Sequence, residues 1–144
     1  MSNGARDGGT AFEVVTRREG GGGGGNESGA VLLVGDAGAG KSTTTMACLG
    51  TGLEVLGDDF CFVAPTEPAP MVDAMYRLAK LDERSLDLLP HLRDRVVGTG
   101  LRGKSLIELD QLTSSSLPIR AVCHVTRDHS RPTGLEPLSR MQAL

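Results

Sequence analysis

The stretch GDAGAGKST, residues 35–43, has the residue types and spacing of a loop that binds phosphate. Gly35 and Gly40 permit backbone conformations that a Cβ disfavours, so successive N–H groups can curl around an anion. Lys41 would reach the β- and γ-phosphates of a nucleotide, and the Ser42 hydroxyl would ligate Mg²⁺. The spacing is that of a Walker A motif. The predicted nucleotide-binding residues are Gly35, Asp36, Ala37, Gly38, Ala39, Gly40, Lys41, Ser42 and Thr43.

Two adjacent carboxylates, Asp58 and Asp59, are the second candidate for chemistry, and Asp58 follows Lys41 by 17 residues. A carboxylate beside the γ-phosphate can hold Mg²⁺ through water or accept the proton of an attacking hydroxyl. We therefore predict Lys41, Asp58 and Asp59 as catalytic residues, and Ser42 and Asp58 as metal ligands. Side chains alternate along an extended segment, so the two acids are expected to face opposite ways. The sequence does not say which of them is catalytic.

Each motif also has a simpler explanation. The loop could be a chance match in a chain with 20 glycines, and Gly57–Asp59 could be a solvated turn. The flanking segments favour function, because AVLLV at 30–34 is typical of a buried parallel strand. KSTTTMACLG at 41–50 then predicts a helix of about two and a half turns. A strand before the loop and a helix after it are the context that the Walker A motif requires.

The remaining elements must position these groups. A strand at 53–57 delivers the acids, and we expect a parallel crossover in which this strand pairs directly with 30–34. Further predicted elements are an apolar stretch at 60–65, a helix or strand at 71–81, a short helix at 83–92 broken at Pro90, an alternating segment at 104–112, a strand at 117–127 and a truncated helix at 134–144.

The N-terminal part differs in composition from the rest. Residues 16–29 include six consecutive glycines, which lose too much backbone entropy on ordering to form a helix or strand. Before them, AFEVVTR at 11–17 predicts one short strand at a sheet edge. We therefore divide the chain into a flexible segment, 1–29, and an ATP-binding domain, 30–144.

Charge and cysteine content limit the function further. The net charge is −3 and the pI is near 5.6, so nothing favours nucleic acid or an anionic membrane as a partner. No segment resembles a signal peptide or a membrane span. Three cysteines do not form a complete set of internal disulfides, which favours a reduced, cytoplasmic setting.

Other possible sites have weaker support. A zinc set of Cys61, Cys123, His124 and His129 lacks ligand spacing. A second GKS triplet, at 103–105, lacks the preceding glycines and strand. A basic edge could meet phosphate or an acidic substrate, but a solvated face is the favoured interpretation of its residues. These residues are Arg77, Lys80 and Arg84.

The segment 29–63, with its compact loop-to-acid spacing, resembles the HPr kinase/phosphorylase group and its serine-kinase relatives. The resemblance continues in AMYRLAKLDERSLDLLPHL and, more faintly, in GKSLIELDQL and SLPIRAVCHVTR, and so covers most of residues 29–127. It implies an α/β fold with a P-loop and a mixed sheet like the ATP-binding core of phosphoenolpyruvate carboxykinase. We expect this fold in an incomplete or reduced form.

The resemblance implies that the γ-phosphate of Mg-ATP is transferred to a hydroxyl of a protein or small molecule. Lys41 and Ser42 would take the nucleotide and metal roles, and one of Asp58 and Asp59 would be the catalytic carboxylate. The chain departs from the family, because no histidine precedes the loop and the later signature loop has no match. A non-catalytic or fragmentary nucleotide-binding module is therefore the alternative. An NTP hydrolase is disfavoured by the lack of an Arg-rich lid, and a homo-oligomer is left open.

Overall fold

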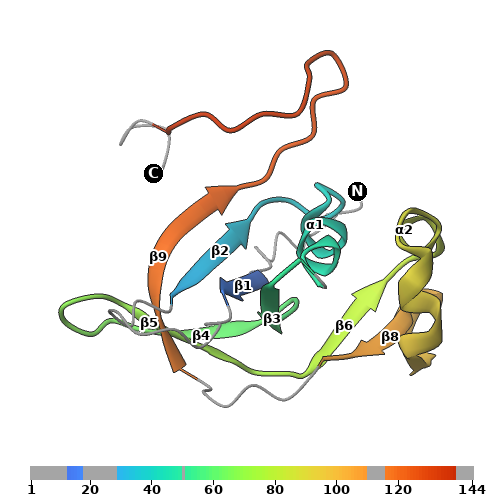
Figure 1. The fold of residues 1–144 in the computed structure, drawn as a ribbon, viewed down its shortest axis with the longest axis horizontal. Helices are drawn as coiled ribbons and strands as arrows, with labels where there is room; N and C mark the ends of the chain where they lie inside the picture. Colours follow the sequence, from blue (N-terminus) through green and yellow to red (C-terminus); the bar gives the residue numbers. More distant parts are fainter. Residues whose placement is uncertain (1–12, 18–28, 50, 110–115, 139–144) are drawn as a thin grey trace, which may run out of the picture.

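The computed structural model describes residues 13–17, 29–49, 51–109 and 116–138. The strands are β1 (Glu13–Arg17), β2 (Ala30–Val34), β3 (Leu53–Gly57), β4 (Cys61–Ala64), β5 (Met71–Ala74), β6 (Leu78–Leu81), β7 (Val96–Thr99), β8 (Ser105–Glu108) and β9 (Ser116–His124). The helices are α1 (Lys41–Ala47) and α2 (Glu83–Leu88), with the 3₁₀ turns η1 (Pro90–Arg95) and η2 (Leu101–Gly103). The chain therefore has a mixed α/β fold with few helices, as the α/β prediction requires (Figure 1).

The larger sheet has the strand order β3-β1-β2-β9-β5-β4. Strand β1 pairs antiparallel with both β2 and β3, so β2 and β3 run in the same direction with β1 between them. Two predictions are thus wrong, because β1 is an interior strand and β3 does not pair directly with β2. The width of α1 explains why one strand fits between β2 and β3, since a helix about 10 Å wide covers two strand separations of about 4.8 Å each.

Strand β9 joins two parts of the larger sheet. Its second part pairs parallel with β2, whereas its first part, residues 116–118, pairs antiparallel with β5. The β4–β5 hairpin then lies close to β3, because a Cβ on Gly57 would be 3.2 Å from the Cβ of Ala74. Parallel and antiparallel pairing together make this a mixed sheet, as expected.

Strand β3 separates two hydrophobic clusters, because alternate side chains of a strand point to opposite faces. Val55 belongs to a cluster beneath α1, and Leu56 belongs to a second cluster, formed by side chains from strands of the larger sheet. The first cluster comprises Met46, Val55, Ala79, Leu81, Leu86, Leu92, Ile107 and Leu109. The second comprises Ala30, Leu32, Leu56 and Val72. The first cluster joins α1 to the smaller sheet, β6-β8-β7, and so fixes the helix that carries Lys41.

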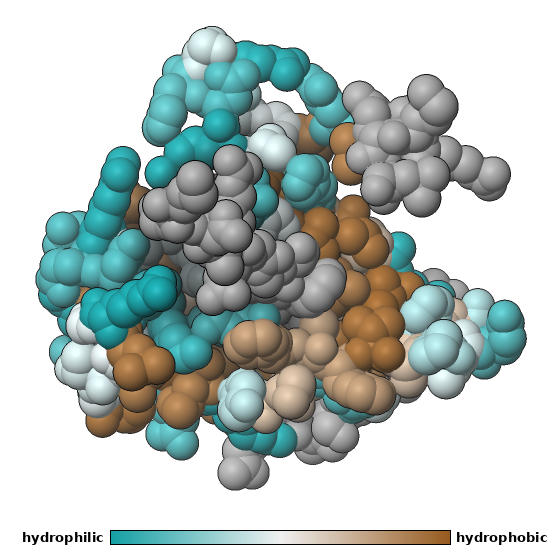
Figure 2. All heavy atoms as spheres, turned by 180° about the vertical axis from the view of Figure 1, so that it is seen from behind, coloured by the Kyte–Doolittle hydropathy of each residue, from teal (hydrophilic) through white to brown (hydrophobic). Residues whose placement is uncertain are grey.

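Large hydrophobic side chains are also exposed, among them Phe60, Phe62, Tyr76 and Val122. Figure 2 shows hydrophobic residues gathered on the face opposite to the view of Figure 1. Patches of this kind are typical of surfaces that contact other molecules. None of the helices among the described residues has the length and apolar character that a membrane span needs.

Several predicted elements differ in length or type. Helix α1 ends at Ala47, before the predicted end at 50, and its three consecutive threonines have low helix propensity. The ambiguous segment 71–81 forms the two strands β5 and β6. The predicted helix at 83–92 divides into α2 and η1 at Pro90, as expected from a residue that cannot continue a helix.

The two ends of the chain also differ from expectation. Residues 16 and 17 of the predicted glycine joint belong to β1, and residues 18–28 lie outside the described part of the chain. Residues 134–138 have no regular structure, where a helix at 134–144 was expected; the last six residues again lie outside the described part. Leu135 and Leu138 are exposed, and a short segment that buries no apolar face gains too little to form a helix.

Candidate functional site

The glycine loop, residues 35–40, connects β2 to α1 in a conformation that its glycines make possible. Gly38 and Gly40 have φ angles of 82° and 102°, a region that disfavours residues with a Cβ. Gly35 has φ 149°, and a Cβ there would lie 2.4 Å from the carbonyl oxygen of Val125. The Ala39 N–H donates to the Asp36 carbonyl over 3.1 Å, which closes a turn inside the loop. Gly35 and Gly40 therefore have the backbone freedom that the sequence predicted for them.

Lys41, the first residue of α1, folds back over this loop and is only 5% exposed. Its Nζ donates to the carbonyl oxygens of Gly35 at 2.8 Å and Asp36 at 3.0 Å. Among the described residues, Lys41 has no carboxylate partner. A buried cation without an anion is unfavourable, so the loop is electrostatically suited to an anionic ligand.

The side chains of two threonines of α1, Thr43 and Thr45, take part in packing. The Thr43 hydroxyl lies 2.8 Å from the hydroxyl of Ser85, which links α1 to α2. Thr45 is fully buried, and its Oγ1 has no hydrogen-bond partner among the described residues. Thr43, predicted as a nucleotide-binding residue, thus uses its side chain in helix packing; its backbone N–H is still at the start of α1.

The Asp pair lies directly after β3 in a strained turn. The Phe60 N–H donates to the Asp58 carbonyl over 2.8 Å, which places Asp59 at the centre of a three-residue turn with φ 67°. A γ-turn with this sign of φ is rare, and such strain is concentrated at functional sites. Asp58 is only 2% exposed. The alternative of a solvated turn therefore does not describe Asp58.

Lys80 of β6 contacts both acids but in different ways. Its backbone N–H donates to Asp58 Oδ2 over 2.7 Å, and its Nζ lies 2.7 Å from Asp59 Oδ2. The hydrogen bond that Lys80 Nζ donates to Asp59 raises the pKa of Lys80, and burial opposes this effect. The other oxygen of Asp58, Oδ1, is buried and has no partner among the described residues. Asp59 is thus neutralised by an ion pair, whereas Asp58 has one buried oxygen without a partner among the described residues.

The fold brings the glycine loop and the Asp pair to one edge of the larger sheet. Both follow the carboxyl ends of strands that run in the same direction, β2 and β3, with only β1 between them. Two strand separations amount to about 10 Å, a span that the phosphate chain of a nucleotide and its metal ion can cover. Within the described residues, neither Lys41 nor Thr43 is hydrogen bonded to either acid.

A further cationic residue, Arg127, lies beside the loop and was not predicted from the sequence. A guanidinium nitrogen of Arg127 lies 3.8 Å from the position that a Cβ on Gly40 would take. The residue follows β9, which runs parallel to β2 and therefore ends at the same sheet edge. The indication in the sequence was a basic residue at the end of the predicted strand 117–127, which only the strand order makes meaningful.

The other candidate sites gain no support. Within the described part of the chain, no three His, Cys, Asp or Glu residues are grouped as a metal site would require. The three cysteines are free, and burial raises the pKa values of the Cys48 and Cys61 thiols, which disfavours reactive thiolates. Arg77 and Arg84 are exposed, as a solvated face predicts.

Comparisons of this chain with protein-family models, curated proteins and solved structures find no match. The chemistry of the site is therefore inferred from its own residues. These are a glycine loop closed by a buried lysine, and, at the same sheet edge, a buried carboxylate with one oxygen that no described residue contacts by a hydrogen bond.

Proposed function

We propose that this chain is an ATP-binding phosphotransferase that resembles HPr (serine) kinases and has their P-loop fold. It would transfer the γ-phosphate of Mg-ATP to a hydroxyl of a protein or small molecule. The observation that carries the proposal is Asp58, a buried carboxylate whose Oδ1 has no partner among the described residues, close to a phosphate-type loop. Such an unsatisfied charged oxygen is costly unless it serves a ligand.

The nucleotide would be held by the glycine loop and Lys41. The backbone N–H groups of 35–43 would surround the phosphates, and Lys41 would exchange its contacts with Gly35 and Asp36 for phosphate oxygens. The hydroxyl of Ser42 and Oδ1 of Asp58 are oxygen ligands of the kind that Mg²⁺ prefers. When bound, Mg²⁺ neutralises charge on the phosphate chain.

Of the two acids, we assign the reactive role to Asp58. Its Oδ2 is held by the Lys80 N–H, so Oδ1 has a defined direction and can contact the metal's water shell or accept the proton of the acceptor hydroxyl. Asp59 is paired with the Lys80 ammonium and instead sets the sharp turn that follows β3.

A nucleotide-binding module without transfer is the second candidate. It is favoured by the ion pair of Lys80 with Asp59, because that pair neutralises the charge of one of the two carboxylates at the site. The two candidates share the binding step and differ only in chemistry. Binding and transfer must therefore be measured separately.

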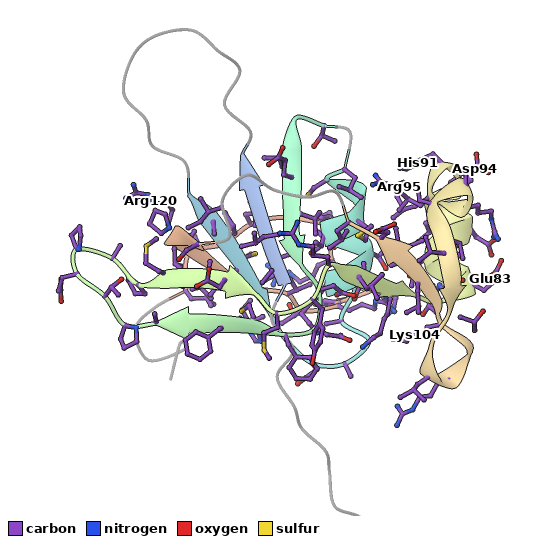
Figure 3. The ribbon with its side chains drawn as sticks, turned by 90° about the horizontal axis from the view of Figure 1, so that it is seen from below. Glu83, His91, Asp94, Arg95, Lys104 and Arg120 are labelled. Carbon is purple, nitrogen blue, oxygen red and sulfur yellow. The ribbon has the colours of Figure 1, made fainter. Side chains whose placement is uncertain are left out.

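The binding test compares the Mg-ATP affinity of the wild type, Lys41→Ala and Lys104→Ala. Lys104 stands in a second Gly-Lys-Ser triplet, is exposed, and lies in the part of the molecule that contains the smaller sheet (Figure 3). We expect Lys41→Ala to weaken binding by about 10- to 100-fold, the effect of losing charge-assisted hydrogen bonds to phosphate. Lys104→Ala should bind like the wild type. Equal affinities for all three proteins would refute a phosphate role for the glycine loop.

The transfer test supplies γ-labelled ATP with protein and small-molecule hydroxyl acceptors. Label transfer that Asp58→Asn abolishes and Asp59→Asn retains supports the kinase and the assignment of the acids. Tight binding without transfer supports the non-catalytic module. Release of inorganic phosphate without any labelled acceptor indicates an NTP hydrolase instead.

A further inference from the structure

Arg127 is a cationic residue that lies beside the glycine loop. It is exposed, and no hydrogen bond or ion pair joins its guanidinium to another described residue. Two other arginines are paired: Arg93 with Glu83 and Asp87, and Arg131 with Glu136. An unpaired guanidinium 3.8 Å from the Cβ position of Gly40 therefore faces the glycine loop with its donors unused.

The backbone that carries Arg127 is fixed against the glycine loop at two points. The Val125 N–H donates to the Val34 carbonyl over 2.7 Å and so extends the pairing of β9 with β2 beyond the end of both strands. The Val125 carbonyl lies so close to Gly35 that any Cβ there would be 2.4 Å away. Only Thr126 lies between Val125 and Arg127, so the position of Arg127 beside the loop follows from sheet pairing.

The charges on this side of the loop are unbalanced. Lys41 places an ammonium group inside the loop, and Arg127 adds a guanidinium outside it, while neither has a carboxylate partner among the described residues. Two cations that converge repel one another, and an anion that binds between them removes this repulsion. Arginine suits phosphate in particular, because its planar fork donates two parallel hydrogen bonds to phosphate oxygens.

We propose that Arg127 is a nucleotide-binding residue whose guanidinium donates hydrogen bonds to the phosphate chain held by the glycine loop. The inference rests on the proposed function, since it needs a nucleotide at residues 35–43. It adds a group from the far end of the sequence to a site that the sequence confines to residues 35–59. The loop would then be closed by Lys41 from within and by Arg127 from the segment that follows β9.

The test measures Mg-ATP affinity by calorimetry for the wild type, Arg127→Ala, Arg127→Lys and Arg120→Ala. Arg120 is a matched control, because it is an exposed arginine of β9 near Gly29, at the opposite end of β2 from the glycine loop (Figure 3). Seven residues of extended chain separate the two by about 23 Å. We expect Arg127→Ala to weaken binding by about tenfold or more, Arg127→Lys to recover part of the loss, and Arg120→Ala to match the wild type.

The possible failures are distinguishable. If the wild type binds Mg-ATP, Lys41→Ala weakens it, and Arg127→Ala equals Arg120→Ala, the role of Arg127 is refuted while the proposed function stands. If the wild type binds no Mg-ATP, the proposed function and this inference fail together. Thermal unfolding of each variant in the absence of nucleotide verifies that a loss of affinity does not come from a loss of structure.

Discussion

The substitution Asp58→Asn is expected to stabilise the nucleotide-free protein while it abolishes transfer. Asp58 is a buried carboxylate in which Oδ2 accepts one hydrogen bond, from the Lys80 N–H, and Oδ1 accepts none from a described residue. An unsatisfied buried acceptor costs about 1–3 kcal/mol, and more when it is charged. Asparagine keeps an oxygen for the Lys80 N–H and removes the charge, but it leaves an amide nitrogen unpartnered. We therefore expect Asp58→Asn to raise the free energy of unfolding by about 1 kcal/mol.

This gain is measurable by urea unfolding. The chain has no tryptophan and one tyrosine, so far-UV circular dichroism is the appropriate probe. For a domain of this size, about 1 kcal/mol corresponds to a rise in Tm of roughly 3–5 °C. Saturating Mg-ATP, at about 100 times its Kd, should stabilise the wild type by a further 2.7 kcal/mol or so. The Asp58→Asn variant should not transfer phosphate, and Mg-ATP should stabilise it less than it stabilises the wild type.

Asp59→Asn is the matched control. Asn tolerates the positive φ of 67° at this position, so the turn should persist. The ion pair with Lys80 is partly exposed, with 41% and 31% of the two side chains accessible, and its loss should cost about 0.2–1 kcal/mol. If Asp58→Asn instead destabilises the protein by more than about 1 kcal/mol and Asp59→Asn abolishes transfer, our assignment of the two acids is wrong.

Two further predictions concern the loop and α2. Gly35→Ala should lower the free energy of unfolding by at least about 2 kcal/mol, because its Cβ would meet the Val125 carbonyl. The Cβ of Gly38→Ala would meet no atom, so this variant should lose only about 1 kcal/mol, the cost of a left-handed backbone conformation. Asp82 accepts a hydrogen bond from the Ser85 N–H, and hydrogen bonds from the side chain and backbone of Ser85 lower its pKa below the ordinary 3.8. Its capping contribution, about 1 kcal/mol, is therefore present above pH 3.8 and lost as the pH falls through the lowered pKa.

The controls for these predictions lie in the same elements. Equal losses for the two glycine variants would contradict the close approach of Val125 to the loop. Asp87 is an acidic residue of α2 that does not cap it, so Asp87→Ala should be less destabilising than Asp82→Ala at pH 7. A stability difference between wild type and Asp82→Ala that persists unchanged at pH 2.5 would refute the capping argument.

Strands β2 and β3 and the glycine loop were predictable because residues close in the sequence determine them. Apolar runs define β2 and β3, and the positive φ angles of the loop 35–40 favour the glycines found there. The resemblance to HPr kinases, and the ATP and Mg²⁺ that it implies, remain predictions. The ambiguity of 71–81 arose because short apolar segments fit both helical and strand periods, and packing of Ala79 and Leu81 against α1 decides for a strand.

The sequence by itself determined that a phosphate-type loop follows a buried strand, and that two acids follow the next strand of the same direction. Only the tertiary structure decided that β1 lies between these strands and that Arg127 lies beside Gly40. It also decided that Lys80 neutralises Asp59, and that Oδ1 of Asp58 has no partner in the described part of the chain. The physical reason is that pairing between distant strands depends on which sheet edges remain open after the local elements form. Lys41 and Arg127, which lie far apart in the sequence, and the two adjacent acids, Asp58 and Asp59, acquire their roles from that pairing.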